Sequence, residues 1–235
     1  MVRKSLVENI RKRQREGLFP VISEIKLRSE KLGDLIRGRD PLKLVDEMAK
    51  SPVTGISVVT ESRFFGGSMS LLEDVVARVS LPVLQKDFIR EASQLEQSAK
   101  LGASAVLLIA SLLDDNQLVK LIDAGKEIGI ELLVEVHTAS EMARVKDLSF
   151  DLLGINNRDI TILEIDDTDV GLTESLAKYR PLDRPLISES SIKSPEDVLR
   201  AGRAGADGVL VGTAVMLADD PRTFLKSLVS VGWPL

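Results

Sequence analysis

Four charged side chains lie in or directly after runs of apolar residues that have the composition of buried β-strands: Glu24, Lys26, Lys86 and Glu135. A buried lysine or glutamate is costly unless it is paired, so charges in such runs are uncommon without a purpose. Two lysines and two glutamates that meet in one pocket can supply both an acid and a base for proton transfer near neutral pH. For any one of them the alternative is a solvated strand end or a structural ion pair, but the four together favour reactive chemistry.

Polar residues also end two later strand-like runs. One run ends in Asn156, Asn157 and Arg158, and the next ends in Glu189. Side chains two residues apart on a strand point to the same face, so Glu24 and Lys26 are expected to share one face.

Small and hydroxyl-bearing residues follow two consecutive strand-like runs near the C-terminus. Ser190 and Ser191 follow the first run, and Gly212 and Thr213 follow the second. Small residues let backbone N–H groups approach an anion at the start of a short helix, which is the recurrent phosphate site of α/β barrels. An ordinary tight connection is the alternative reading, and only the pairing across neighbouring strands favours a phosphate site.

Residue counts exclude several kinds of site. The chain of 235 residues has no cysteine and one histidine, His137, so it has no thiolate nucleophile and no multi-histidine or Cys-ligated metal site. His137 is expected to form a hydrogen bond at the rim of the fold rather than to act as a catalyst. No Walker A, GxGxxG or HExxH motif occurs.

The elements that must position these residues alternate between short β-branched runs and amphipathic helical patterns, which is typical of a parallel sheet built from βα units. Eight runs are predicted as strands, over residues 20–26, 55–60, 81–86, 104–110, 130–136, 151–156, 184–190 and 207–212. Amphipathic stretches between them are predicted as helices over 41–50, 91–101, 116–128, 140–148 and 194–204. Eight such units in a chain of this length fit an α/β fold, the (β/α)8 TIM barrel, better than a doubly wound sheet.

No linker interrupts this alternation, so the sequence predicts a single domain. Residues 1–19 are expected to form a short N-terminal helical extension before the first strand, with Leu6, Ile10 and Leu18 facing inward, and residues 20–235 are expected to form the barrel.

The charge balance gives little reason to expect a macromolecular partner. Lys and Arg number 31 against 36 Asp and Glu, and the two signs are interspersed, so neither nucleic acid nor a membrane surface is favoured. The longest nearly apolar run, 103–113, is too short to cross a bilayer, and no secretory signal is recognisable. These features predict a protein of the cytoplasm that acts on a small molecule.

Seven segments in this order and spacing resemble indole-3-glycerol phosphate synthase, from about Val21 to about Leu225. They are ISEIKLRS (22–29), VVTESRFFGGS (58–68), LPVLQKDFI (81–89), LLVEV (132–136), LGINNRD (153–159), LISESSI (186–192) and LVGTAVM (210–216). The resemblance implies a (β/α)8 barrel that closes the indole ring of 1-(2-carboxyphenylamino)-1-deoxyribulose 5-phosphate in tryptophan biosynthesis. The reaction releases carbon dioxide and water and needs no metal or organic cofactor.

The resemblance also implies roles for individual residues. Lys86 matches the proposed general acid, and Lys26 matches the lysine that holds the substrate carboxylate and serves as a candidate acid in dehydration. Glu135 and Glu24 match two glutamates with proton-transfer or charge-stabilising roles, whose division of labour stays open. The remaining positions match polar or phosphate-binding residues: Asn156, Arg158, Glu189 and Ser190, together with Ser29, Gly212 and Thr213. Ser191 extends the expected phosphate loop.

Three departures from the family pattern bear on substrate affinity and loop closure. Glu30 stands where proline usually follows Ser29, and Ser191 stands where the loop usually reads Glu-Ser-Gly. A side chain at that position is costly if the backbone needs a positive φ or a close approach to phosphate. The segment before the first strand is also shorter than the N-terminal extension of many members.

Two alternatives to the synthase are considered on the residues present. A phosphoribosylanthranilate isomerase is disfavoured because its chemistry depends on a Cys/Asp pair and this chain has no cysteine. A catalytically weakened barrel that binds a sugar phosphate, or a scaffold subunit, is favoured by Ser191 and Glu30 but disfavoured by the lysines at the strand ends. The expected assembly is a monomer, with other enzymes of the tryptophan pathway as candidate partners.

Overall fold

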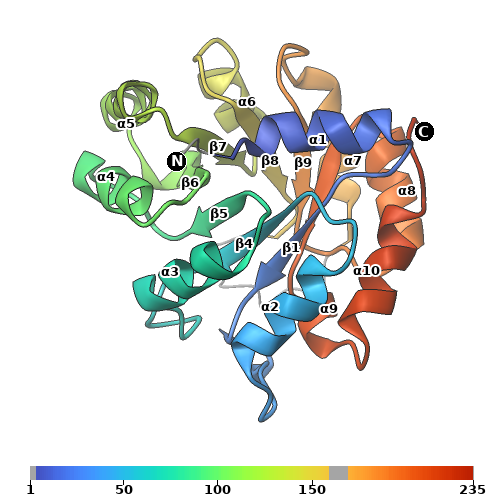
Figure 1. Cartoon of the computed structure of the whole chain (residues 1–235). Coiled ribbons are helices and arrows are strands. Elements are labelled where there is room, and N and C mark those ends of the chain that lie inside the picture. The colour runs from blue at the N-terminus through green and yellow to red at the C-terminus, as the bar shows by residue number, and fades with distance from the viewer. Residues whose placement is uncertain (1–3, 159–168, 235) are drawn as a thin grey trace.

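Eight parallel strands close into a barrel in the computed structural model, which describes residues 4–158 and 169–234 (Figure 1). Each strand pairs with its neighbours around the ring in the order β1-β10-β9-β8-β7-β6-β5-β4. The strands are β1 (Val21–Ile25), β4 (Gly55–Val59), β5 (Val83–Lys86), β6 (Ala105–Ile109), β7 (Glu131–Val136), β8 (Leu152–Asn156), β9 (Leu186–Glu189) and β10 (Gly208–Val211). All eight predicted strands and the predicted barrel are confirmed.

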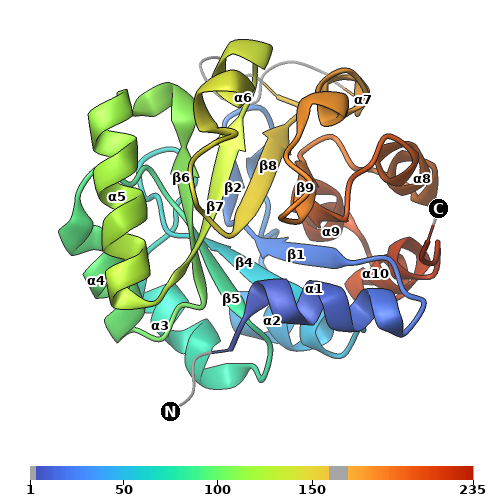
Figure 2. The ribbon, with the colours of Figure 1, turned by 90° about the horizontal axis from the view of Figure 1, so that it is seen from above.

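Helices follow the strands and form the outer layer of the barrel (Figures 1 and 2). They are α2 (Pro41–Ala49), α3 (Met69–Arg78), α4 (Ala92–Lys100), α5 (Asp115–Ile128), α6 (Ala139–Val145), α7 (Gly171–Leu176), α8 (Pro195–Arg203), α9 (Thr213–Leu217) and α10 (Pro221–Val229). Many begin after a side chain that accepts a hydrogen bond from a backbone N–H of the first turn, as Ser68, Asp114 and Ser194 do. The five helices whose ranges were predicted from the sequence are confirmed, whereas α3, α7, α9 and α10 were not among them.

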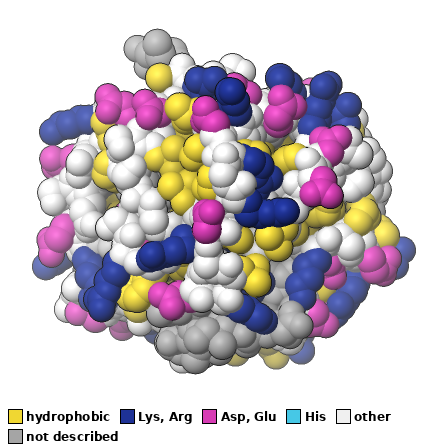
Figure 3. Space-filling view, turned by 90° about the horizontal axis from the view of Figure 1, so that it is seen from below, with side chains coloured by type: hydrophobic (Ala, Val, Ile, Leu, Met, Phe, Trp, Pro, Cys, Tyr) yellow, Lys and Arg dark blue, Asp and Glu magenta, His cyan; other side chains and the backbone are white. Residues whose placement is uncertain are grey.

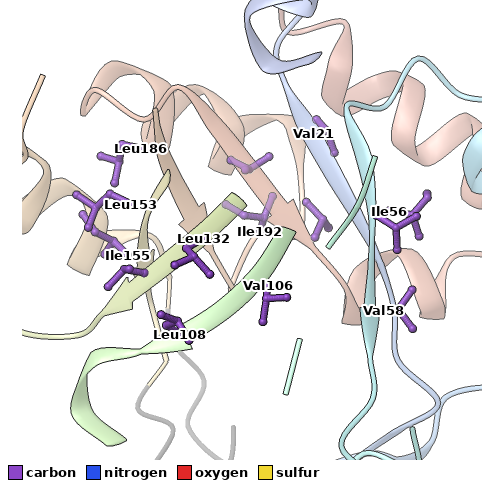
Figure 4. Packing of buried hydrophobic residues seen from close by; sticks show 14 of the residues in the cluster. Val21, Ile56, Val58, Val106, Leu108, Leu132, Leu153, Ile155, Leu186 and Ile192 are labelled. Atoms are coloured by element: carbon purple, nitrogen blue, oxygen red, sulfur yellow. The ribbon is translucent and has the colours of Figure 1, made fainter. Parts of the chain in front are cut away.

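The core has two layers because side chains alternate along each strand. All five residues of β6 are buried, and Val106 and Leu108 belong to the cluster that packs between the strands and the helices (Figure 4). Ala105, Leu107 and Ile109 belong instead to a second cluster inside the barrel. This two-residue period accounts for strand sequences that are apolar at nearly every position.

Helix α1 (Leu6–Arg15) crosses one end of the barrel (Figures 1 and 2). Leu6 and Ile10 are fully buried and join the cluster inside the barrel, which confirms the inward face predicted for this segment. The first residue of β7, Glu131, accepts hydrogen bonds from the Ser5 hydroxyl and from the Leu6 backbone N–H, the latter at 2.6 Å. The helix therefore closes the barrel at the amino ends of the strands.

A small hairpin of β2 (Arg28–Ser29) and β3 (Gly33–Asp34) lies in the loop after β1. The sequence patterns did not predict it. Arg28 donates to the Phe64 carbonyl oxygen at 3.0 Å, so the hairpin is tied to the loop after β4.

The surface carries charges of both signs. On the face shown in Figure 3, Lys and Arg side chains are mixed with Asp and Glu, and hydrophobic side chains gather near its middle. Within the two described ranges, no helix is both long enough and apolar enough to cross a membrane.

Candidate active site

The charged residues at the carboxyl ends of the strands point into the barrel because of their strand parity. Ile22, Leu84, Leu133, Ile187 and Leu210 are buried inside the barrel. Every second residue after such a position faces the same way. Counting by twos gives Glu24 and Lys26 on β1, Lys86 on β5, Glu135 on β7 and Glu189 on β9. The barrel therefore converts five separate sequence positions into one cluster.

Lys86 lies at the centre of this cluster. Its Nζ atom is 3.1 Å from Oε2 of Glu189, 3.7 Å from Oε2 of Glu24 and 3.9 Å from Oε2 of Glu135. Lys26 completes the group, with Nζ 4.0 Å from Oε1 of Glu24. The Glu24 carboxylate, which also accepts a hydrogen bond from Ser57 Oγ at 3.4 Å, thus lies between the two ammonium groups.

Together, burial and the neighbouring charges favour the charged form of Lys86 and the neutral form of Glu189. Burial alone would lower the pKa of Lys86, but the carboxylates of Glu189, Glu24 and Glu135 outweigh it and hold the pKa above its usual value. Burial raises the pKa of Glu189 to about 8, because the opposing attraction of Lys86 is partly cancelled by repulsion from Glu135. The cluster therefore holds a firmly charged ammonium group beside a carboxyl that can carry a proton near neutral pH.

Two glycines at inward positions make room for the carboxylates. A β-carbon on Gly154 of β8 would collide with Oε1 of Glu189, and one on Gly212 after β10 would collide with Oε1 of Glu24. Gly154 lies opposite Glu135 in the β7–β8 pairing. Only glycine at these two positions leaves space for the buried carboxylates next to Lys86.

A cavity of about 580 Å³, open to solvent, lies over the cluster. Glu24, Lys26, Lys86, Glu135, Asn156 and Arg158 line it, so six of the residues predicted to act in catalysis share one pocket. Its apolar wall was not predicted as part of the site and consists of Val59, Phe65, Phe88, Leu107 and Ile109. The two residues from β6 could have been found from the alternation of inward positions on that strand. The remaining lining residues are Glu61 and Asp87.

Glu189 lies beneath this cavity. Its side chain is 0% exposed and contacts the cavity-lining Lys86. Oδ1 of Asn156 accepts a hydrogen bond from the Arg158 backbone N–H at 3.1 Å, which holds the backbone of the loop after β8. Asp159, the last residue of the 153–159 motif, lies outside the described residues.

A second cavity adjoins the first and shares Glu24, Lys26, Lys86 and Arg158 with it. Its other side is formed by Ser190, Ser191, Gly212 and Thr213, the residues predicted to bind phosphate. Lys31 and Lys193 also line it and were not predicted. Gly212 and Thr213 lie at the N-terminal end of the short helix α9, and the lysines and Arg158 of the lining outnumber its one glutamate, so the cavity favours an anion.

The loop after β9 has an unusual backbone. Ser190 has a φ of 64° and Ser191 a φ of 60°, both in the left-handed region that favours glycine. The conformation is held by Asn157, whose Nδ2 donates to the carbonyl oxygens of Glu189 at 2.9 Å and Ser190 at 3.3 Å. Position 191 therefore has the positive φ at which a side chain was expected to be costly.

Two predicted features lie away from the cavities. Ser29 is buried in the β2–β3 hairpin, where its Oγ accepts a hydrogen bond from the Leu32 backbone N–H at 3.2 Å, and it lines neither cavity. Its role in phosphate binding stays a prediction. Glu30 is exposed and lines neither cavity.

His137 follows β7 and is 10% exposed. Its Nε2 is 3.4 Å from Oε1 of Glu135, and its Nδ1 is 3.5 Å from Oε2 of Glu141. In place of the predicted rim hydrogen bond, His137 makes these two longer contacts with carboxylates, one of which belongs to the charged cluster. In the part of the chain that the structure describes, no group of three or more His, Asp or Glu side chains could hold a metal ion.

Comparison with known proteins agrees with this site. A family model described as indole-3-glycerol phosphate synthase matches residues 2–228. The indole-3-glycerol phosphate synthase of Pyrococcus furiosus is 46% identical over 210 residues, which cover 89% of this chain and 91% of that protein. The enzymes of the same name from Thermococcus kodakarensis and Kineococcus radiotolerans are 44% and 41% identical; the matches cover 90% of this chain in both cases, and 92% and 76% of those proteins.

A solved structure shows the same fold at low sequence identity. Tryptophan synthase subunit alpha from Legionella pneumophila superposes with a TM-score of 0.67 at 13% identity, covering 97% of each chain. This likeness concerns the barrel alone.

Proposed function

The chain belongs to the indole-3-glycerol phosphate synthase family, and we propose that the two adjoining cavities of its barrel carry out that reaction through Lys86, Lys26 and the glutamates around them. The enzyme is a carboxy-lyase of tryptophan biosynthesis. It closes the indole ring of 1-(2-carboxyphenylamino)-1-deoxyribulose 5-phosphate and releases carbon dioxide and water. The observation that carries the assignment of residues is the convergence of two lysines and three glutamates at the junction of the cavities.

The two cavities suit the two ends of the substrate. The cavity with the apolar wall fits the aromatic ring, and the cavity lined by Ser190, Ser191, Gly212 and Thr213 fits the phosphate. Lys26 and Lys86 line both cavities, so they lie beside the bonds that change. Lys26 is also placed to hold the carboxylate that leaves as carbon dioxide.

Ring closure needs a proton on the ketone oxygen. When the ring carbon that bears the carboxylate bonds to the carbonyl carbon, the electron pair of the C=O bond moves to oxygen. The Lys86 ammonium group stabilises that charge and donates a proton to it. Loss of carbon dioxide then restores the aromatic ring. Because three carboxylates keep Lys86 charged in the free enzyme, the acid is in its active form over the physiological pH range.

Dehydration needs an acid for the departing hydroxyl group and a base for the proton lost from the new ring. Lys26 supports the first role, and Glu135 or Glu24 supports the second, since both carboxylates line the same cavity. Glu189 is buried under Lys86 and returns or accepts its proton rather than contacting the substrate. The reaction uses a small-molecule substrate, and we place it in the cytoplasm, in a monomer.

A fluorescence assay of indole-3-glycerol phosphate formation tests this proposal. We expect turnover by the wild type and a loss of about 100-fold or more in kcat for Lys86→Ala, because a positioned proton donor contributes at least that much. Lys120→Ala, which removes an exposed lysine from α5, is the matched control and keeps full activity. Binding of inorganic phosphate without turnover by the wild type would instead indicate a sugar-phosphate-binding barrel.

A further inference from the structure

A row of side chains extends from the charged cluster to helix α6 through the one histidine of the sequence. Glu135 contacts Lys86 at 3.9 Å on one side and His137 at 3.4 Å on the other. His137 contacts Glu141 at 3.5 Å. The imidazole therefore lies between two carboxylates, one in the reaction cavity and one outside it.

Glu141 is fixed independently of the imidazole. It is in the first turn of α6, its backbone N–H is capped by Thr138 Oγ1 at 3.1 Å, and its own Oε2 accepts the His137 backbone N–H at 2.8 Å. A carboxylate in the first turn of a helix that accepts a hydrogen bond from a backbone N–H preceding the helix is a stable arrangement. Glu141 thus gives the imidazole a fixed partner that does not move with the substrate.

The charges facing the imidazole are all negative among the groups that the structure relates to it. Glu135 from β7, Glu141 from α6 and Glu189 from β9 each favour its protonated form, although burial opposes it, and together they hold the pKa of His137 above its usual value. The same pairing holds the pKa of Glu141 below its usual value, against burial. In the cluster itself, the carboxyl groups of Glu24, Glu135 and Glu189 lie around the ammonium group of Lys86, and Glu24 also contacts Lys26.

We propose that His137 is a positioning residue for Glu135: held by Glu141, the imidazole fixes the carboxylate of Glu135 toward Lys86. This inference rests on the proposed function, in which Glu135 is a base, and adds two residues that act through it. His137 lines neither cavity, so its effect on the reaction passes through Glu135. A carboxylate that has lost this partner rotates more freely and spends less time in the orientation that faces Lys86.

Nuclear magnetic resonance tests the contact directly, because the chain has one histidine and its imidazole signals need no assignment. With a histidine-free purification tag, the imidazole is titrated in the wild type, Glu135→Gln and Glu141→Gln. We expect a midpoint above 6.5 in the wild type and a lower midpoint in both variants. The control Asp147→Asn removes an exposed carboxylate just after the same helix and leaves the midpoint unchanged.

Kinetics test the consequence for the reaction. We expect His137→Gln and Glu141→Gln to lower kcat by about 10-fold or more while KM changes less than about 3-fold, since a positioned base contributes 100-fold or more when intact. A merely structural role for His137 would lower thermal stability but leave kcat unchanged at temperatures where the variants stay folded.

The two measurements separate failure of the inference from failure of the proposed function. A histidine midpoint that does not respond to Glu135→Gln overturns the inference even when the wild type turns over substrate. Wild-type kcat in a folded His137→Gln variant overturns it as well. If the wild type shows no turnover but the midpoint responds to both variants, the contact stands and the proposed function fails.

Discussion

The carboxylate of Glu189 occupies the space that a side chain on Gly154 would fill. The two residues lie on adjacent strands, β9 and β8, and both point into the barrel. Glu189 is fully buried. The absence of a β-carbon on one strand therefore determines where the carboxyl of the next strand meets Lys86, at 3.1 Å.

We expect Gly154→Ala to lower both stability and activity. The added methyl group overlaps the Glu189 carboxylate, and overpacking of this kind costs about 1 to 3 kcal/mol of the free energy of unfolding. Displacement of Glu189 from Lys86 is expected to lower kcat by about 10-fold or more. Urea unfolding and the fluorescence assay measure the two effects.

The double variant Gly154→Ala/Glu189→Ala is the control for this clash. With the carboxylate removed, the alanine at 154 has space, so its cost in a Glu189→Ala background is expected to be smaller by about 0.5 to 3 kcal/mol. Activity stays low in the double variant, because the carboxyl is missing. Equal costs of Gly154→Ala in the two backgrounds would show that the two residues do not compete for the same space.

The left-handed backbone at position 191 leads to a second prediction. A non-glycine residue in this region costs about 1 to 2 kcal/mol relative to its ordinary conformation, and Ser191 has a φ of 60°. Ser191→Gly removes that cost. Ser149→Gly is the matched control, since Ser149 is exposed and is not among the residues of positive φ.

The comparison between the two glycine variants is the measurement. Both substitutions increase the conformational entropy of the unfolded chain by the same amount. Ser191→Gly is therefore expected to be more stable than Ser149→Gly by about 1 to 2 kcal/mol in urea unfolding. A Ser191→Gly variant that is no more stable than the control would mean that contacts of the serine side chain compensate for its backbone strain.

The barrel and its charged cluster could be predicted because both follow from local patterns. Alternation of strand and helix signals gave the eight strands, and residue parity placed Glu24 and Lys26 on one face. The role of Gly154 could not be predicted from the sequence. A glycine in a strand does not indicate which neighbouring side chain occupies the space next to its Cα atom. The apolar wall was missed for a related reason: alternation along the strand could place Leu107 on the inward face, but only the assembled barrel shows that it lines the cavity.

The raised pKa of Glu189 leads to a prediction about stability and pH. Its pKa is about 8 in the folded protein and near the ordinary value of 4.5 in the unfolded chain. Between these values the unfolded chain releases the proton while the folded protein keeps it, so stability from this group is lost as the pH rises. In Glu189→Gln that titration is absent.

Urea unfolding at pH 5, 6, 7 and 8 measures the effect. The free energy of unfolding of the wild type is expected to fall more steeply with pH than that of Glu189→Gln, by no more than about 1.4 kcal/mol per pH unit, the limit for one proton. Glu127→Gln, which changes an exposed residue on α5, keeps the wild-type slope. Parallel curves for wild type and Glu189→Gln would contradict a raised pKa at this position.

The attachment of α1 to the amino end of the barrel gives the last prediction. Glu131 accepts hydrogen bonds from Ser5 Oγ and from the backbone N–H groups of Leu6 and Val7, so a carboxylate on β7 caps the helix from outside. At the other end of the helix, Asp207 before β10 contacts Arg11 at 3.2 Å. Burial raises the pKa of Glu131, although the hydrogen bonds from Ser5 and Leu6 oppose it. The cost of desolvating the carboxyl group therefore offsets part of the stability that these hydrogen bonds contribute.

Glu131→Ala leaves the buried N–H groups of the first turn without their acceptor. We expect a loss of about 1 to 3 kcal/mol in the free energy of unfolding, because an unsatisfied buried donor costs that much. Hydrogen exchange is expected to speed up in residues 6–15 first, with the catalytic end of the barrel and KM unchanged, since α1 lies at the opposite end of the strands. Glu127→Ala, an exposed glutamate on α5, gives the baseline within about 0.5 kcal/mol. Uniform acceleration of exchange throughout the barrel would instead show that α1 unfolds only together with the whole protein.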